Sequence, residues 1–273
     1  MDLPMNNKIA FLTAIIILML NLHSTAIAQN AFADNKLIDV LKKNNIQLND
    51  GHILIPHWVK HIKIDIGLSY SAPITQKWLE HEKNLLVFAF EPNPTAVASI
   101  KNPKNVALPN HGKPLEHHYI NNKVFIIPVA LGSKHATLDF YITELDIGCS
   151  SLYKPKASFQ NIKDVIKVDV FRLDSFLKLI PWDQVKYIEY IKIDAQGHDL
   201  EIVKGMGEYI AKVVYITLEP EDYTYEGCQE NNLNNIIAYM KSKNFVLVKN
   251  KKTSDPTFLN KNLRYDSYLY IEQ

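Results

Sequence analysis

Apolar runs alternate along this chain with amphipathic stretches, and this alternation predicts strands and helices in turn. Residues 61–66 and 85–90 predict two apolar strands, and a helix is predicted after each of them. The second helix is expected to begin with Asn93 as its N-cap and Pro94 as its first residue. A strand, a helix, a strand and a helix in succession are typical of a parallel sheet with right-handed crossovers. The predicted fold class is therefore α/β with a mostly parallel sheet.

The stretch from residue 187 to residue 210 is the one around which candidate chemistry gathers. Residues 187–193 predict a strand, and apolar residues at helical spacing between 200 and 210 predict the helix that follows it. The turn between them contains Asp194, Gln196 and His198. Ligands of open α/β sheets bind beside the carboxyl ends of strands, so we expect these side chains to face a site.

The remaining strands follow the same pattern less regularly. Strands are predicted at residues 124–130, 136–143, 165–171 and 212–218, and a helix at 234–243. Two final strands, at residues 245–248 and 265–271, are expected to form an antiparallel pair.

Length and composition predict one large globular domain behind a leader. The chain has 273 residues, of which 47% are hydrophobic and 22% charged. We divide it into a signal peptide or membrane anchor at residues 1–28, an N-terminal helix and lead-in at 29–58, and the main domain at 59–273.

The leader has the three parts of a secretory signal. Lys8 precedes an apolar run over residues 9–20, and Ala26-Ile27-Ala28 follows as a small-residue cleavage pattern. This predicts a secreted or periplasmic protein that is cleaved after Ala28. The alternative is an uncleaved anchor, which would associate the protein with a membrane through its N-terminal segment.

Charge and cysteine content exclude several classes of protein. The net charge is +1 with a pI near 7.7, and no block of consecutive Lys and Arg occurs, so no nucleic-acid partner is expected. Cys149 and Cys228 are the only cysteines, which excludes a disulfide scaffold and a cysteine-based zinc ribbon.

Asp65 and Glu91 lie at the ends of two consecutive predicted strands. An acidic residue at the end of the second strand accepts hydrogen bonds from ribose hydroxyls in nucleotide-binding α/β folds. The loop after the first strand lacks the G-x-G-x-x-G pattern, and no G-x-x-x-x-G-K-[ST] pattern exists in the chain. A nucleoside without phosphates, such as S-adenosylmethionine, fits these features.

Several motifs occur together in one order. They are Asp65-Ile66-Gly67, Phe88-Ala89-Phe90-Glu91-Pro92-Asn93-Pro94, Val129-Ala130-Leu131-Gly132, Ser150-Ser151-Leu152, Leu173-Asp174-Ser175-Phe176 and Ile191-Lys192-Ile193-Asp194-x-x-Gly197-His198-Asp199-Leu200-Glu201 through Gly205. Over residues 50–271 this series resembles the FkbM family of methyltransferases. The last motif is the distinctive one.

The resemblance implies a Rossmann-like class I fold with a seven-stranded sheet and a C-terminal antiparallel strand. It also implies methyl transfer from S-adenosyl-L-methionine, usually to an oxygen of a sugar, glycolipid or small metabolite. The cofactor-binding residues that we predict on this basis are Asp65, Gly67, Ser69, Glu91, Asn93 and Ala130. The chain departs from the family pattern at Ser69, in a loop that is usually rich in glycine, and at Gln196, where an acidic residue is common.

Asp194 and His198 are the predicted catalytic residues, as candidates to take the proton of a substrate hydroxyl. Asp194 could instead orient the hydroxyl or the amino group of the cofactor. A third alternative places a divalent cation between Asp194 and Glu219 at adjacent strand ends, and we rank it below the metal-free mechanism.

Because S-adenosylmethionine is made in the cytosol, an exported domain suggests a rival hypothesis. The chain would then be a degenerate Rossmann-like binding module for a glycan or nucleoside, without methyl transfer. Retention of S-adenosylmethionine binding separates the two hypotheses.

Overall fold

The computed structural model describes residues 28–102, 112–249 and 255–263. The chain divides into two compact units, Met1–Asp39 and Val40–Gln273, and residues 28–43 are helical. The predicted leader lies outside the described residues except for residue 28. Within the described part, no helix is both long and apolar enough to cross a membrane.

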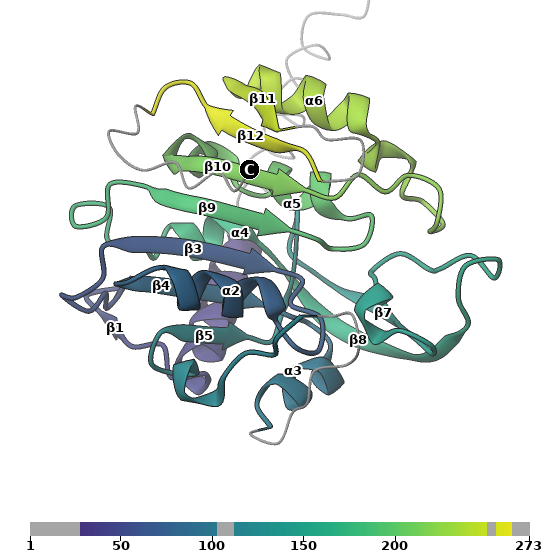
Figure 1. Ribbon diagram of the computed structural model, residues 1–273, viewed down its shortest axis with the longest axis horizontal. Helices are drawn as coiled ribbons and strands as arrows, with labels where there is room; N and C mark the ends of the chain where they lie inside the picture. Colours follow the sequence, from purple (N-terminus) through teal and green to yellow (C-terminus); the bar gives the residue numbers. More distant parts are fainter. Residues whose placement is uncertain (1–27, 103–111, 250–254, 264–273) are drawn as a thin grey trace, which may run out of the picture. The chain divides into compact units, whose positions relative to one another are not determined.

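A seven-stranded sheet forms the centre of the second unit (Figure 1). Its order is β11 (Phe245–Lys249), β12 (Thr257–Asn260), β10 (Val213–Leu218), β9 (Ile188–Ile193), β3 (His61–Ile66), β4 (Leu85–Phe90) and β5 (Val124–Ile127). Neighbouring strands from β10 to β5 are parallel, whereas β12 runs antiparallel to both of its neighbours. The predicted α/β fold with a mostly parallel seven-stranded sheet and a C-terminal antiparallel strand is therefore confirmed.

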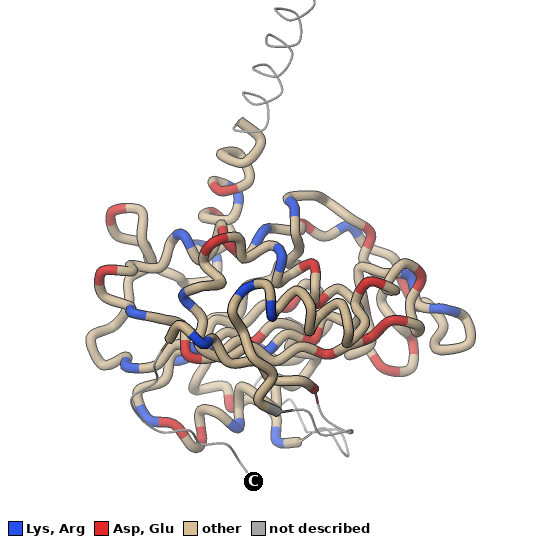
Figure 2. Tube along the Cα trace, turned by 90° about the horizontal axis from the view of Figure 1, so that it is seen from above, with Lys and Arg blue, Asp and Glu red and all other residues tan. Residues whose placement is uncertain are grey.

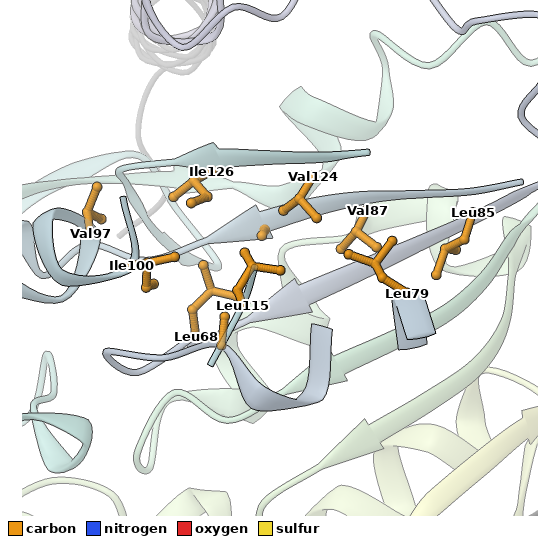
Figure 3. Close-up of a cluster of buried hydrophobic side chains, with 11 residues drawn as sticks. Leu68, Leu79, Leu85, Val87, Val97, Ile100, Leu115, Val124 and Ile126 are labelled. Atoms are coloured by element: carbon orange, nitrogen blue, oxygen red, sulfur yellow. The ribbon is translucent and has the colours of Figure 1, made fainter. Parts of the chain in front are cut away.

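Helices cover both faces of the central strands. They are α2 (Pro73–His81), α3 (Pro94–Ile100), α4 (Leu173–Leu177), α5 (Asp199–Lys204) and α6 (Leu233–Ser242). Alternate residues of β4 point to opposite faces, as the pleat requires. Leu85 and Val87 join the apolar cluster that α2 and α3 cover (Figure 3), whereas Phe88 packs against Phe176 of α4 with ring centroids 5.1 Å apart.

A second, three-stranded sheet stands beside the carboxyl ends of the central strands (Figure 1). It is built from β6 (Ala130–Gly132), β8 (Ile162–Arg172) and β7 (Ala136–Thr143), with β8 in the middle. The prediction of one strand over residues 124–130 was wrong. Pro128 has no N–H to donate to a ladder, so the strand ends at Ile127 and the chain restarts in the other sheet at Ala130.

The helix after β9 is shorter than predicted. Instead of continuing to residue 210, α5 ends at Lys204 and a 3-10 helix, η3 (Gly207–Lys212), follows. A Cβ at Gly205 would lie 2.1 Å from the carbonyl oxygen of Gly132, so the backbone passes β6 at a distance that only glycine allows. Gly207 has a φ of +55°, which a regular α-helix does not contain.

The strand β11, predicted at residues 245–248, forms an antiparallel pair with β12. Residues 265–271, which were predicted to be its partner, lie outside the described residues. The remaining short elements are β1 (Leu48–Asn49), β2 (His52–Ile53), η1 (His117–Tyr119), η2 (Ile147–Cys149) and η4 (Gln229–Asn231).

The carboxyl ends of β3 and β9 approach each other at Gly67. A Cβ at this residue would lie 1.8 Å from the carbonyl oxygen of Asp194, and its φ of +79° is in the left-handed region. The N–H of Asp194 donates to the carbonyl of Ile66 over 3.0 Å, which continues the strand pairing into this junction. A side chain at Gly67 would separate the two strand ends.

We expect Gly67→Ala to lower the free energy of unfolding by about 3 kcal/mol or more, measured by denaturant titration. Left-handed backbone costs a residue with a Cβ about 1–2 kcal/mol, and overpacking adds about 1–3 kcal/mol. Gly51→Ala is the matched control, because Gly51 has a φ of +78° but nothing within 4 Å of its Cβ position. Equal losses in the two variants would show that the close approach at Gly67 is unimportant.

Candidate functional site

A pocket opens at the carboxyl ends of β3, β4 and β9, and the three-stranded sheet forms its far wall. It contains about 590 Å³ of empty space, part of it open to solvent. Six of the eight residues predicted for the site line it: Gly67, Ser69, Glu91, Ala130, Asp194 and His198. Asp65 and Asn93 are not part of its lining.

Lys192 joins the two strand ends beneath the pocket. Its Nζ donates to the carbonyl of Gly67 over 2.8 Å and lies 3.1 Å from Oδ2 of Asp194 and 3.6 Å from Oδ1 of Asp65. Burial disfavours the ammonium, but the two carboxylates outweigh burial and raise the pKa of Lys192. The lysine is therefore a fixed positive charge in the site.

Asp65 is buried close to Lys192 and does not line the pocket. Its side chain is 1% exposed, and its Oδ2 accepts a hydrogen bond from Oγ1 of Thr75 over 2.6 Å. Burial raises the pKa of Asp65, against the opposing effect of Lys192. Its predicted role in cofactor binding stays a prediction, and the geometry makes any such role indirect.

Glu91 is buried beside the first loop, with 5% of its surface exposed. Its Oε2 accepts the N–H groups of Leu68 and Ser69, each over 3.1 Å, and its Oε1 accepts the N–H of Asn93 over 2.8 Å. Burial raises the pKa of Glu91 to about 7, even though the three amides favour the carboxylate. Since each carboxylate oxygen has two lone pairs, Oε1 keeps one for a ligand hydroxyl.

Asn93 caps α3, as its position before Pro94 predicted. Its Oδ1 accepts the N–H of Thr95 over 3.0 Å, and the side chain is 1% exposed. Among the described residues its buried Nδ2 has no hydrogen-bond partner. Cofactor binding by Asn93 stays a prediction.

The first loop is held in an unusual backbone conformation. Ser69 has a φ of +55°, in the left-handed region that glycine adopts most readily. A Cβ on Gly148 would lie 2.8 Å from Oγ of Ser69, so the loop and η2 touch at this point. The side chain of Ser69 is thus accommodated by a glycine in the opposite segment.

Gln196 connects the turn after β9 with three other parts of the unit. Its Nε2 donates to Oδ1 of Asp194 and to Oε2 of Glu219, both over 2.8 Å. Its Oε1 accepts the hydroxyl of Tyr225 over 2.7 Å, and its carbonyl accepts Oγ of Ser151 over 2.8 Å. The amide therefore makes two donor contacts to carboxyl groups, which a carboxylate in its place could not make.

Asp194 and Glu219 differ in ionisation. Burial favours the neutral form of Asp194, but Lys192 and hydrogen bonds from Glu219 and Gln196 outweigh it and lower the pKa. Burial raises the pKa of Glu219 well above its usual range, and the neighbouring Asp194 raises it further. At neutral pH the pair therefore holds one proton, on Glu219.

Asp199 joins the β9 turn to the end of β10. Its Oδ1 accepts the N–H of Ala195 and its Oδ2 accepts the N–H of Glu219, both over 2.8 Å. The residue is fully buried, and burial together with Asp194 raises its pKa to about 7. Asp199 thereby fixes the spacing of the two strand ends.

His198 faces the pocket as a neutral ring. Burial lowers the pKa of its imidazole to about 4, and the ring packs edge to face on Tyr153 with centroids 5.1 Å apart. Among the described residues its buried Nδ1 has no hydrogen-bond partner. His198 can accept or donate one hydrogen bond, but such a pKa makes it a weak base at pH 7.

The far wall of the pocket is apolar. Phe140 of β7, Ile147 of η2 and Leu152 line it, and they belong to the apolar cluster of the three-stranded sheet. The hydroxyl of Tyr225 also lies 2.8 Å from the carbonyl of Cys149, which ties this wall to the segment after β10.

Sequence reasoning missed several residues that shape the pocket. A lysine inside the apolar run of residues 187–193 was a usable signal for Lys192, because a charge in a buried strand requires partners. For Phe140 there was no local signal, since it reaches the pocket from β7 of the three-stranded sheet. Among the described residues, no group of three or more His, Cys, Asp or Glu is placed to hold a metal ion.

Comparison with known proteins identifies one family. Residues 67–247, more than half of the chain, match the family model described as "Methyltransferase FkbM domain". A similar solved structure is that of methyltransferase FkbM from Methylobacillus flagellatus KT, at 12% identity and a TM-score of 0.42. The match covers 76% of this chain and 44% of that one, so this chain corresponds to less than half of that protein. No curated protein matches the chain.

The raised pKa of Glu91 predicts how stability depends on pH. The folded state protonates this carboxyl at about pH 7 and the unfolded state at about 4.5, so the folded state binds more protons between these values. Unfolding then releases a proton, and the stability that Glu91 contributes falls as the pH rises through this window. A shift of this size corresponds to roughly 3 kcal/mol.

We therefore expect the free energy of unfolding to fall between pH 5 and pH 8. Asp199, whose pKa is also raised to about 7, adds to this decline. Glu91→Gln should reduce the decline by roughly 3 kcal/mol, the part that Glu91 contributes. Denaturant titrations at several pH values measure the slope, which is independent of any uniform loss in the variant. Glu208→Gln, at an exposed position, is the control. An unchanged slope in Glu91→Gln would contradict this assignment.

Proposed function

The chain belongs to the FkbM family of methyltransferases, and on that premise we propose that it transfers the methyl group of S-adenosylmethionine to a hydroxyl group of a sugar, a glycolipid or a small metabolite. The observation that carries this proposal is Glu91, a buried carboxyl that lines the pocket at the end of β4 with one lone pair free. A carboxyl in this place suits a ribose hydroxyl.

The residues present fit a nucleoside better than a nucleotide. Val129, Ala130 and Leu131 give the pocket an apolar strip beside Glu91, which suits the faces of a base. Two N–H groups of the first loop donate to Glu91, so they are not directed at a phosphate group. When bound, S-adenosylmethionine would supply an electrophilic methyl group on a positively charged sulfur.

The chain's own residues would orient the reactants. Gly67 and Ser69 line the pocket on the side of the first loop, where the methionine part is expected. Asp194, which is ionised and 34% exposed, can accept a hydrogen bond from the acceptor hydroxyl. Holding two reactants in an attacking geometry can lower a barrier by about 7–11 kcal/mol, and most of the catalysis is assigned to this effect.

The partner that fits this site is a small molecule or glycan. Figure 2 shows basic and acidic residues interspersed along the described trace, which supports the proposal that no nucleic acid is bound. The leader supports export or membrane association, and this also stays a proposal.

We expect calorimetric titration of the full chain with S-adenosylmethionine or S-adenosylhomocysteine to show one saturable site. Glu91→Gln should weaken binding at least tenfold, because it replaces the buried carboxylate that would accept the ribose hydroxyl, and hydrogen bonds to charged groups contribute about 1.5–3 kcal/mol. Glu189→Gln is the matched control, since Glu189 is 15% exposed and pairs with His61 and Lys63. Its affinity should stay within threefold of wild type.

Methyl transfer itself can be followed with tritiated S-adenosylmethionine and an extract of the producing cells as the source of acceptors. We expect one fraction of the extract to become labelled. The same fraction of untreated extract is called the acceptor fraction below. If the folded wild type binds neither nucleoside, with or without magnesium, the methyltransferase proposal fails and a binding module for a glycan or another nucleoside takes its place.

A further inference from the structure

Two carboxyl groups meet at the ends of β9 and β10, where only one of them lines the pocket. Asp194 lines it, whereas Glu219 does not. Gln196 donates to both over 2.8 Å, so the two carboxyl groups lie against one amide nitrogen. Two carboxylates so close together repel each other, which favours a proton on one of them that can be donated to the other.

The positions of the charges decide which group holds this proton. The ammonium of Lys192 lies 3.1 Å from Asp194 and favours its carboxylate. Among the residues that the structure describes, Glu219 forms no ion pair, while Asp194, Asp199 and Asp255 all act on it with negative charge. Tyr225 contacts Gln196 and the backbone carbonyl of Cys149 through its hydroxyl. Burial raises the pKa of Tyr225 and of Cys149, so both are neutral at pH 7. The arrangement therefore puts the proton on Glu219.

Gln196 is held so firmly that it can fix this geometry. Its backbone is in the left-handed region, with a φ of +52°, and Tyr225 and Ser151 bind its side-chain oxygen and its carbonyl. The amide nitrogen is then directed at the two carboxyl groups. Each of its two hydrogens has one acceptor, Oδ1 of Asp194 and Oε2 of Glu219.

We propose that Glu219 is an un-ionised positioning residue, whose carboxylic acid acts with the Gln196 amide to hold Asp194 as the carboxylate that receives the acceptor's hydroxyl proton. This inference rests on the proposed function and adds two residues to it. Glu219 touches neither reactant in this account, and its effect passes through Asp194.

The step balances without any further reagent. An oxygen lone pair of the acceptor forms the new C–O bond, the C–S bond breaks, and its electron pair stays on sulfur to give neutral S-adenosylhomocysteine. The hydroxyl proton passes to Asp194 and then to solvent. Because an alkylated hydroxyl is far more acidic than a free one, even a carboxylate of low basicity can take the proton once the C–O bond forms.

The test compares two replacements of Glu219 in the full chain, with the acceptor fraction and tritiated S-adenosylmethionine. Glu219→Ala removes the donor to Asp194 and should lower the rate at least tenfold. Glu219→Gln supplies an amide that can accept from Gln196 and donate to Asp194, so it should restore the rate to within about threefold of wild type. Gln196→Ala and Asp194→Asn should each lose at least tenfold.

The pH dependence separates a positioning role from a merely structural one. Wild type should slow as the pH rises from 7 to 9.5 and Glu219 begins to ionise, whereas Glu219→Gln cannot ionise there. The ratio of the variant rate to the wild-type rate should therefore rise with pH. The proposal would be overturned if Glu219→Gln were as inactive as Glu219→Ala. It would also be overturned if the wild-type protein lost activity with EDTA. In either case Glu219 would act as a carboxylate.

A measurement without any acceptor keeps this inference separate from the proposed function. Carboxyl carbons labelled with ¹³C report ionisation by nuclear magnetic resonance, and Glu219→Gln identifies the signal by its loss. We expect the Glu219 signal to be that of a carboxylic acid at pH 7 and the Asp194 signal to be that of a carboxylate. An ionised Glu219 at pH 7 would overturn the inference even if methyl transfer occurs.

Discussion

The rest of the site depends on the contact between Gly67 and the backbone of Asp194. Because no side chain stands between them, the ends of β3 and β9 come close enough for Lys192 to donate to the carbonyl of Gly67. This contact brings the first loop and the turn after β9 to one edge of the sheet. The pocket is the space that these two segments share with the end of β4 and the three-stranded sheet.

A single buried lysine then determines which carboxyl groups are charged. Lys192 compensates Asp194, so this carboxylate stays ionised at the pocket. Glu91, Asp199 and Glu219 lack a comparable partner, and burial raises the pKa of each. At neutral pH the site thus holds one fully ionised carboxylate, Asp194, among acidic groups that are wholly or partly protonated. This arrangement favours positioning of the reactants over strong base catalysis.

The sequence predicted the parts of this site that local patterns determine. The strand before Glu91, the Asn93 cap and the placement of Asp194 at a strand end follow from apolar runs and turn residues. Contacts between distant segments could not be predicted, because packing sets them: Phe140 reaches the pocket from the second sheet, and Tyr225 finds Gln196 across 29 residues of chain. Two elements were predicted too long: the strand over residues 124–130, which ends before Pro128, and the helix up to residue 210, which ends before Gly205. In both, proline or glycine interrupts an apolar pattern.

The decisive measurement is a crystal structure of the full chain with S-adenosylhomocysteine. We expect the nucleoside to lie in the pocket between the first loop and the β9 turn, with a ribose hydroxyl on Oε1 of Glu91 and the sulfur on the side of Asp194. A nucleoside bound elsewhere, or in the pocket with its ribose away from Glu91, would contradict it.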